Sequence, residues 1–237
     1  MSPRLRVAVV IPAYNEEGKI GRVLAKIPTS VVDLTIVVDD ASRDGTADEA
    51  RRGGATVLSH VRNRGVGAAI RTGIDHARGQ GLDIVAVLSG DDQHVPSELP
   101  DVLAPLLAGA ADLVQGSRRL KGGAALEMNL FRRLTTRIYP LLFRLATGYR
   151  STDATNGFRA FRVAIFDDPR IDLWQDWLDT YELEPYLLYQ AVVTGRRVVE
   201  APVTVVYHTR GTTKMKAVRD WWRILRPLVY LHLGLRR

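Results

Sequence analysis

The sequence of 237 residues contains no cysteine. This absence excludes disulfide bonds, thiolate nucleophiles and cysteine-bound zinc, and it is compatible with a reducing compartment. The chain also lacks an internal repeat, a low-complexity tract and a long linker, so we expect a single domain over 1–237. Residues 1–6 lead directly into a strand-like stretch without an apolar signal region, and we expect no signal peptide and a cytoplasmic location.

Positive charge is in excess. The formal net charge is +7 and the pI is near 9.9, which favours an anionic partner such as a nucleic acid, a phosphorylated substrate or a lipid surface. Arginines crowd the second half of the chain, at Arg118, Arg119, Arg132, Arg133, Arg137, Arg144, Arg219, Arg223, Arg226, Arg236 and Arg237. We therefore expect the anion to meet the C-terminal half. Nucleic acid ranks lowest, because these arginines lie in amphipathic patterns without a base-reading motif.

The first half alternates short apolar runs with helical patterns, which is typical of βαβ units. Strands are predicted at 5–11, 34–38, 56–59, 84–88 and 112–114. Helices are predicted at 16–26, 46–52, 66–78 and 97–108. The fold class is therefore α/β, with a mainly parallel sheet flanked by helices.

Polar clusters follow three of these predicted strands. They are residues 12–17 (PAYNEE), 39–46 (DDASRDGT) and 89–94 (SGDDQH). Open parallel sheets bind ligands beyond the carboxyl ends of their strands. We therefore expect the three clusters to lie together on one edge of the sheet.

The cluster 89–94 carries the strongest local signal for a metal ion. Gly90 lets the chain pass close to a ligand, and Asp91 and Gln93 both offer hard oxygen atoms. Mg²⁺ and Mn²⁺ favour such ligands and complete their shell with substrate phosphates and water. The cluster predicts a Mg²⁺ or Mn²⁺ site for a diphosphate, with an exposed acidic turn as the structural alternative.

The cluster 39–46 presents a carboxylate that can accept hydrogen bonds from a base or a ribose. Tyr14 and Glu16 would complete such a pocket from the neighbouring strand end. A simple loop with a capping acid is the alternative. The nearby residues 65–67 (GVG) do not follow the first strand and lack the third glycine of the dinucleotide fingerprint, which excludes a Rossmann dehydrogenase.

Five short stretches, in this order and spacing, extend over most of the chain. They are residues 10–16 (VIPAYNE), 37–46 (VVDDASRDGT), 90–94 (GDDQH), 116–118 (GSR) and 153–160 (DATNGFRA). Together they resemble the inverting family-2 glycosyltransferases with a GT-A fold, and within them the dolichyl-phosphate mannose synthase-like group. The resemblance implies a metal-dependent hexosyltransferase with a nucleoside-diphosphate sugar as donor, linked to GDP or UDP.

The resemblance assigns roles to individual residues of the first part, 1–115, which would bind the nucleotide. Residues expected to hold the nucleoside are Pro12, Tyr14, Glu16 and Asp40. Asp91 and Gln93, beside Gly90, are expected to hold Mg²⁺ or Mn²⁺ on the diphosphate.

The second part, 116–237, is implied to be the acceptor side with basic amphipathic helices. Arg118 is expected to face phosphate, and Lys214 resembles the family's C-terminal basic clamp. Glu184 resembles the acid on the acceptor-side helix. Asp153 is expected either to orient the acceptor or to support the loop before Gly157.

Two residues depart from the pattern of the group. The group usually has an aspartate two residues before Asp91, where this chain has Ser89. A hydroxyl is a weaker metal ligand than a carboxylate, so we expect either a lower metal affinity or a larger part for Asp92. The basic residue usual six places before Lys214 is replaced by His208, and Arg210 lies close enough in sequence to substitute.

Amphipathic helical patterns dominate the second part. Apolar residues recur every four positions over 126–142, and Pro140 is expected to kink or split this helix. The segment 218–232 carries tryptophans and arginines at helical spacing, but arginines and Pro227 interrupt it, so it does not span a bilayer. It would either lie on anionic lipid at the inner face of the cell membrane or pack on the domain with a solvated basic face.

Three hypotheses follow for function. The first is sugar transfer with inversion to a polyprenyl or dolichyl phosphate, whose ionised phosphate needs no strong general base. The second is transfer to a soluble hydroxyl acceptor, with Asp153, Glu182 or Glu184 as the base. In the third, the protein binds a nucleotide sugar with weak or no turnover. The sequence does not specify the donor sugar or the oligomeric state.

Overall fold

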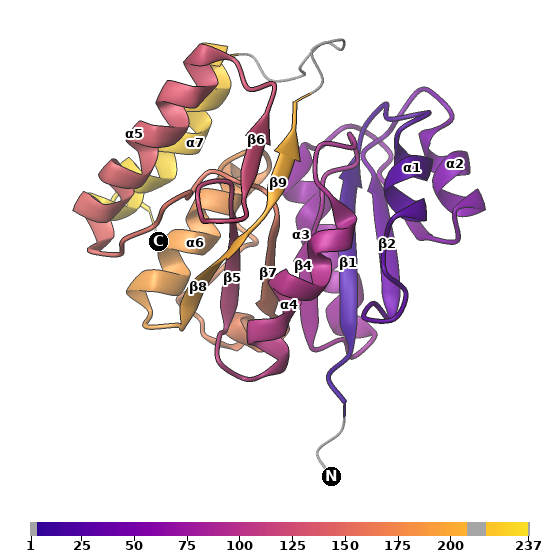
Figure 1. Ribbon diagram of the computed structural model, residues 1–237, viewed down its shortest axis with the longest axis horizontal. Helices are drawn as coiled ribbons and strands as arrows, with labels where there is room; N and C mark the ends of the chain where they lie inside the picture. The colour runs from indigo at the N-terminus through magenta and orange to yellow at the C-terminus, as the bar shows by residue number, and fades with distance from the viewer. Residues whose placement is uncertain (1–3, 208–216, 237) are drawn as a thin grey trace.

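The computed structural model describes residues 4–207 and 217–236. A seven-stranded sheet forms its centre, in the order β3-β2-β1-β4-β7-β5-β8 (Figure 1). The strands are β1 (Val7–Ala13), β2 (Leu34–Asp39), β3 (Thr56–Ser59), β4 (Ile84–Val87), β5 (Leu113–Ser117), β7 (Arg159–Arg162) and β8 (Val198–Pro202). Only β7 runs antiparallel to its neighbours among these strands, so the predicted mainly parallel α/β sheet is confirmed.

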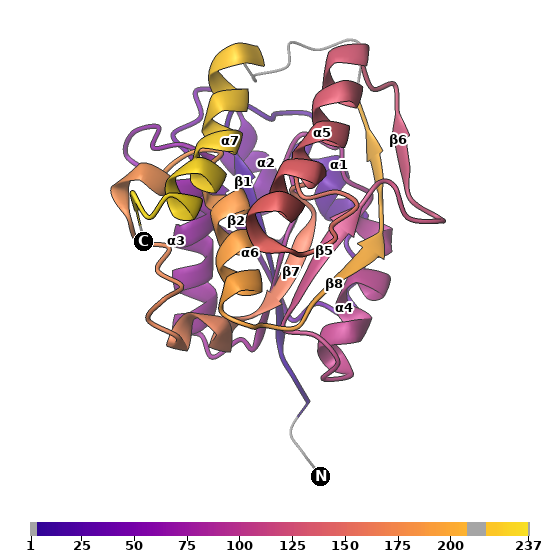
Figure 2. The ribbon, with the colours of Figure 1, turned by 90° about the vertical axis from the view of Figure 1, so that its left-hand side faces the viewer.

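Helices cover both faces of the sheet (Figures 1 and 2). They are α1 (Ile20–Ala25), α2 (Thr46–Arg52), α3 (Val66–Gly79), α4 (Leu99–Leu107), α5 (Leu130–Thr147), α6 (Leu183–Val193) and α7 (Ala217–His232). Short 3₁₀ turns occupy Pro96–Glu98, Val163–Asp167 and Asp176–Leu178. Because both faces are covered, β1 and β4 are apolar along their whole length rather than alternating.

Alternate residues of the strands point to opposite faces of the sheet and pack into two separate hydrophobic cores. In β1, Val9 and Ile11 pack with α1 and α4 on one face. Ala8 and Val10 pack with α3 and α6 on the other face. A Cβ on Gly73 of α3 would lie 2.3 Å from a methyl of Val10, so glycine lets this helix lie close against the sheet. This close packing positions the strand ends that carry the polar clusters.

The second half contains elements that local patterns did not predict. A two-stranded parallel ribbon joins β6 (Ala124–Leu126) to β9 (Thr204–Val206), far along the chain. The long helix begins later than the apolar repeat, at Leu130, because Asn129 caps it by accepting a hydrogen bond from the N–H of Arg132 at 2.8 Å. Pro140 does not split α5, which remains one helix to Thr147.

Candidate active site

A cavity of about 470 Å³ opens at the carboxyl ends of β1, β2 and β3. The lining residues are Tyr14, Asp39, Ala41, Ser42, Arg43, His60, Val61, Arg62 and Asn63. Two of the three predicted clusters therefore meet here, as the position of ligands in open parallel sheets requires. Its size and polar lining suit a nucleoside.

The two adjacent aspartates at the end of β2 have different surroundings. Asp39 lines the cavity and is 5% exposed. Asp40 instead accepts hydrogen bonds from the backbone N–H groups of Arg64 and Gly65, both at 2.8 Å, and its Oδ1 lies 2.6 Å from Nδ1 of His60. Sequence reasoning assigned the nucleoside to Asp40, whereas the carboxylate that borders the cavity belongs to Asp39.

Three residues that are not glycine adopt left-handed backbone conformations near these strand ends. They are Asn15 (φ 52°), Ala41 (φ 63°) and Asp92 (φ 63°). Such conformations cost on the order of 1 kcal/mol each and persist where the surroundings impose them. The backbone N–H of Asn15 donates to Oγ of Ser42, and its Oδ1 accepts from the N–H of Arg43. The loops after β1 and β2 are therefore tied together around the cavity.

Pro12 and Glu16, also predicted to hold the nucleoside, are parts of the frame. Pro12 pairs with Val38 in the sheet, and a Cβ on Gly90 would lie 3.1 Å from the Pro12 carbonyl oxygen. Gly90 therefore permits close approach of two strand ends. Glu16 is 7% exposed, and its N–H donates to Oγ1 of Thr46 at 2.7 Å.

The predicted metal ligands lie in the turn after β4. Oδ1 of Asp91 accepts a hydrogen bond from the backbone N–H of Gln93 at 3.2 Å, which shapes the turn. The buried hydroxyl of Ser89 has no hydrogen-bond partner among the described residues. A buried polar atom without a partner is costly unless a ligand satisfies it. These oxygen donors therefore fit a hard cation.

In the described ranges, no three His, Cys, Asp or Glu side chains gather into a metal site.

Asp92 is engaged with α1. Its carboxylate pairs with Arg22 Nε at 3.0 Å and Lys26 Nζ at 2.9 Å. Burial by itself would raise the pKa of Asp92, but the hydrogen bonds from Lys26 and Arg22 outweigh it and hold that pKa below its usual range. These ion pairs fix the left-handed turn at Asp92.

The second part of the chain reaches the same edge through Gly157. A Cβ there would lie 3.0 Å from Oε1 of Glu184 and 3.6 Å from Cε1 of His94. The His94 ring stacks on Phe158, with centroids 5.2 Å apart. Glu184 also lies 3.6 Å from Nε of the buried Arg159. Glu184, the predicted acceptor-side acid, is thus next to the turn that carries the predicted metal ligands.

Tyr181 connects the same groups electrostatically. Burial raises the pKa of Tyr181. Negative charge on Asp220, Glu184 and Asp91 adds to this rise in pKa. Asp91, the predicted metal ligand, and Glu184, the predicted acceptor-side acid, therefore both raise the pKa of the Tyr181 phenol.

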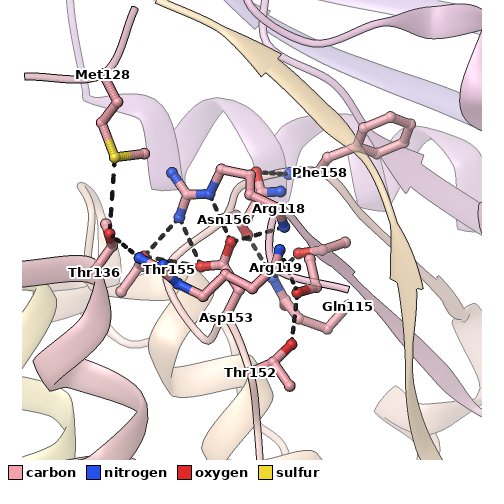
Figure 3. A network of polar contacts seen from close by, with 12 residues as sticks. Gln115, Arg118, Arg119, Met128, Thr136, Thr152, Asp153, Thr155, Asn156 and Phe158 are labelled. Carbon is pink, nitrogen blue, oxygen red and sulfur yellow. Dashed lines mark hydrogen bonds and ion pairs between the residues drawn. The ribbon is translucent and has the colours of Figure 1, made fainter. Parts of the chain in front are cut away.

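Arg118 and Asp153 form a buried ion pair, shown in Figure 3. Nε and Nη2 of Arg118 each donate to the fully buried carboxylate of Asp153 at 2.6 Å. Arg118 also donates to Oγ1 of Thr155 at 2.9 Å and to the hydroxyl of Tyr207. Burial alone would lower the pKa of Arg118, but Asp153 outweighs it and raises that pKa. Arg118, predicted to face phosphate, and Asp153, predicted to orient the acceptor or to support the loop before Gly157, are therefore paired with each other.

Several arginines of the second half are also engaged inside the domain. Arg226 Nη2 lies 2.6 Å from Oε1 of Glu182, which is fully buried. Arg223 lies 3.7 Å from the same oxygen and 3.6 Å from Asp220. These contacts dock α7 on the start of α6. Lys214, His208 and Arg210 lie outside the described residues.

The family emerges from comparison with known proteins. The sequence pattern described as Glycosyl transferase family 2 matches residues 8–168, more than half of the chain. This chain belongs to glycosyl transferase family 2. The match covers the cavity and the turn after β4, so both belong to the part of the chain that defines this family.

Relatives in this family extend over nearly the whole chain. The undecaprenyl-phosphate mannosyltransferase of Micrococcus luteus is 33% identical over 218 residues, 89% of this chain and 88% of that protein. The polyprenol monophosphomannose synthase of Mycolicibacterium smegmatis is 31% identical over 220 residues, 90% of this chain and 82% of that protein.

Solved structures confirm the GT-A fold. Glucosyl-3-phosphoglycerate synthase from Mycobacterium tuberculosis, in complex with phosphoglyceric acid, has a TM-score of 0.73 at 21% identity. The superposition covers 98% of this chain and 81% of that chain. At this identity the likeness shows the fold alone.

Sequence reasoning missed the third loop of the cavity. His60, Arg62 and Asn63 follow β3 directly, so the strand-end rule that found the other clusters would also have found them. Nε2 of His60 lies 2.9 Å from Oγ1 of Thr72, which anchors the loop on α3. The signal was weak because this segment is basic rather than acidic.

Proposed function

We propose that this chain transfers a sugar, with inversion, from a nucleoside-diphosphate sugar to a polyprenyl phosphate. The observation that carries the proposal is one sheet edge bearing both the cavity with Asp39 and the oxygen cluster of Ser89, Asp91 and Gln93. A nucleoside in the cavity would direct its diphosphate toward that cluster. The names of the two relatives support a polyprenyl phosphate acceptor.

The protein groups would bind and orient the substrates. Asp39 would accept hydrogen bonds from the nucleoside, and Tyr14 would line the pocket beside it. Asp91 and Gln93 would hold Mg²⁺ or Mn²⁺, which supplies positive charge to the departing nucleoside diphosphate. Crystals of the related fold in complex with Mn²⁺ and uridine diphosphate support such a metal.

The buried ion pair between Arg118 and Asp153 would support the acceptor side of the site. Arg118 and Asp153 lock the loop before Gly157, so we propose a supporting role for both. An acceptor phosphate is already ionised near neutral pH, so its oxygen can attack the anomeric carbon without a strong base.

Transfer to a soluble hydroxyl acceptor is the second candidate. It needs a general base, and Asp153 and Glu182 are each paired with an arginine and fully buried. Glu184 is 19% exposed at its side chain and lies beside Gly157, so it is the best placed of the three.

A donor panel tests the proposal. The purified protein is incubated with GDP- and UDP-linked radiolabelled sugars, with or without Mn²⁺, and with detergent-dispersed polyprenyl phosphate, 3-phosphoglycerate or no acceptor. Label extracted into organic solvent only with the lipid acceptor is the expected result. Label on the soluble acceptor alone would favour the second candidate, and donor binding without transfer would support a protein that only binds the nucleotide sugar.

A further inference from the structure

Helix α5 exposes a continuous set of large apolar side chains. They are Leu130, Leu134, Ile138, Leu141, Leu142 and Leu145, and Leu130 and Leu145 are 79% and 81% exposed. At about 100° per residue they fall within a sector roughly 120° wide. A contiguous apolar surface of this kind marks an interaction site, because isolated exposed leucines are scattered over ordinary surfaces.

The opposite side of α5 already makes the contacts that the fold requires. Tyr139 and Phe143 are buried, and the Tyr139 hydroxyl donates to the backbone oxygen of Ile224 in α7 at 3.2 Å. Helices α5 and α7 lie side by side at the end of the molecule away from α1 and α2 (Figures 1 and 2). In the part of the chain that the structure describes, none of the sector's side chains belongs to the buried core.

The charge beside the apolar sector is uniformly positive. Arg133, Arg137 and Arg144 are exposed and project from the sector next to the leucines. The helix Leu130–Thr147 contains no aspartate or glutamate. Trp222 of α7 is 49% exposed near the start of α5, where Phe131 meets Trp221 edge to face. Leucines flanked by arginines, with an exposed tryptophan nearby, match a helix that lies in a lipid headgroup region.

We propose that α5 is the surface that seats this protein on an anionic bilayer, with its leucines in the acyl boundary and its arginines on lipid phosphates. This inference rests on the proposed function, since a polyprenyl phosphate acceptor is itself held in a membrane. Within the described residues no helix is long and apolar enough to cross a bilayer.

The charges also argue against a second copy docked on this surface and against α7 as the helix that meets lipid. A second copy docked on the same surface by two-fold symmetry would bring cationic arginines to one interface without an acid on either helix. Arg223 and Arg226 of α7 are engaged with Glu182, so they are not the cations that meet lipid.

Vesicle co-sedimentation of the full chain tests the proposal. Vesicles of phosphatidylcholine, with or without phosphatidylglycerol, are used at low and high salt. A variant with Leu134→Ser, Ile138→Ser and Leu145→Ser should lose acidic-vesicle binding by at least roughly tenfold at both salt concentrations. A variant with Arg133→Gln, Arg137→Gln and Arg144→Gln should lose it mainly at low salt, because screening weakens those contacts already. A matched control, Leu107→Ser with Val193→Ser, replaces exposed apolar residues elsewhere and should bind as the parent does.

Two further measurements separate this proposal from the proposed function. Transfer to polyprenyl phosphate in detergent should be the same in all these variants, because none touches the cavity. Loss of transfer by the parent in that assay would overturn the proposed function and leave the vesicle result standing. Equal vesicle binding by the leucine variant and the control would overturn the α5 surface. A parent dimer in light scattering that only the leucine variant dissociates would also overturn it, in favour of a second copy.

Discussion

The carboxylate of Glu182 is fully buried, and its Oε1 lies 2.6 Å from Nη2 of Arg226, 44 positions further along the chain. This pair joins the start of α6 to the last helix. Arg226 also donates to the backbone oxygen of Trp177 at 3.1 Å. Arg226 therefore attaches the last helix to the domain.

Replacing Arg226 by Gln should lower the free energy of unfolding by about 3 kcal/mol, because a fully buried carboxylate then loses its nearest cation. Arg219→Gln removes an exposed side chain from the same helix, and its partner Asp220 keeps Arg223 at 3.6 Å, so this change should cost less, about 1 kcal/mol or below. Urea denaturation measures both. A double variant with Glu182→Gln should lose less than the sum of the single variants. Equal effects of Arg226→Gln and Arg219→Gln would contradict the role of the pair.

Replacing Asp91 by Asn should reduce transfer by at least roughly 100-fold at limiting Mn²⁺, because a neutral amide replaces an anionic ligand beside the diphosphate. The neighbouring Asp92→Asn is the matched control. It should cost up to about 1 kcal/mol of stability through its ion pairs with Arg22 and Lys26 and leave the Mn²⁺ dependence unchanged. Steady-state rates against Mn²⁺ concentration distinguish the two. A stronger effect of Asp92→Asn than of Asp91→Asn on the Mn²⁺ dependence would show that Asp92, rather than Asp91, is the metal ligand.

Replacing Asp39 by Asn should weaken nucleoside diphosphate binding by roughly tenfold, since a charged hydrogen bond contributes about 1.5–3 kcal/mol. Asp40→Asn should instead lower stability by about 2 kcal/mol, because the N–H groups of Arg64 and Gly65 donate to different oxygens of Asp40 and the amide NH2 that replaces one of them cannot accept. Calorimetric titration with GDP and UDP, beside thermal unfolding, gives both quantities. A stable Asp40→Asn protein that no longer binds nucleotide would show that Asp40, rather than Asp39, contacts the nucleoside.

Replacing Ser89 by Asp should tighten Mn²⁺ binding, because affinity for hard cations rises with ligand charge. Ser89→Ala should leave stability unchanged or slightly higher, since the buried hydroxyl has no hydrogen bond to lose among the described residues. Mn²⁺ titration followed by electron paramagnetic resonance, with donor present, measures the affinity. An unchanged affinity in Ser89→Asp would show that this side chain points away from the metal.

The stability of the fold should decrease as pH falls below about 6.5, the unfolded pKa of histidine. Burial lowers the pKa of His94 to about 3, and the charges of Arg118 and Arg159 add to this. Between these pH values the unfolded chain binds a proton that the folded chain does not, so stability rises with pH. The slope from this residue is at most about 1.4 kcal/mol per pH unit. Urea unfolding of the parent and His94→Gln from pH 4 to 7 should show a shallower slope in the variant, and parallel slopes would contradict this assignment.

Much of the first half could be predicted because its signals are local. The strand ends after β1, β2 and β4 were located from apolar runs followed by polar clusters, and the cavity and the oxygen cluster lie there. The family resemblance assigned the nucleoside to Asp40, whereas Asp39 is the aspartate that lines the cavity. Adjacent residues in an extended strand end point in opposite directions, and which one borders the cavity depends on how the backbone of 60–65 packs on them.

The second half was harder because its partners are distant in sequence. Strands β5 and β8 pair across more than 80 residues, and β7 inserts between β4 and β5 in the opposite direction. No periodicity within a short window contains such information. The same is true of the pair between Arg118 and Asp153, which the sequence presents as two separate candidates for contact with ligands.

The sequence by itself determined the α/β class, the polar strand ends and the family, because each depends on residue type at short spacing. Only the tertiary structure decided which charged groups remain available to a ligand or a membrane. Arg118, Arg223 and Arg226 are cations in the sequence, but in the fold each forms an ion pair with a buried carboxylate from another part of the chain. Burial makes these pairings necessary, because an unpaired charge away from water costs several kcal/mol, and only the fold brings the partners together.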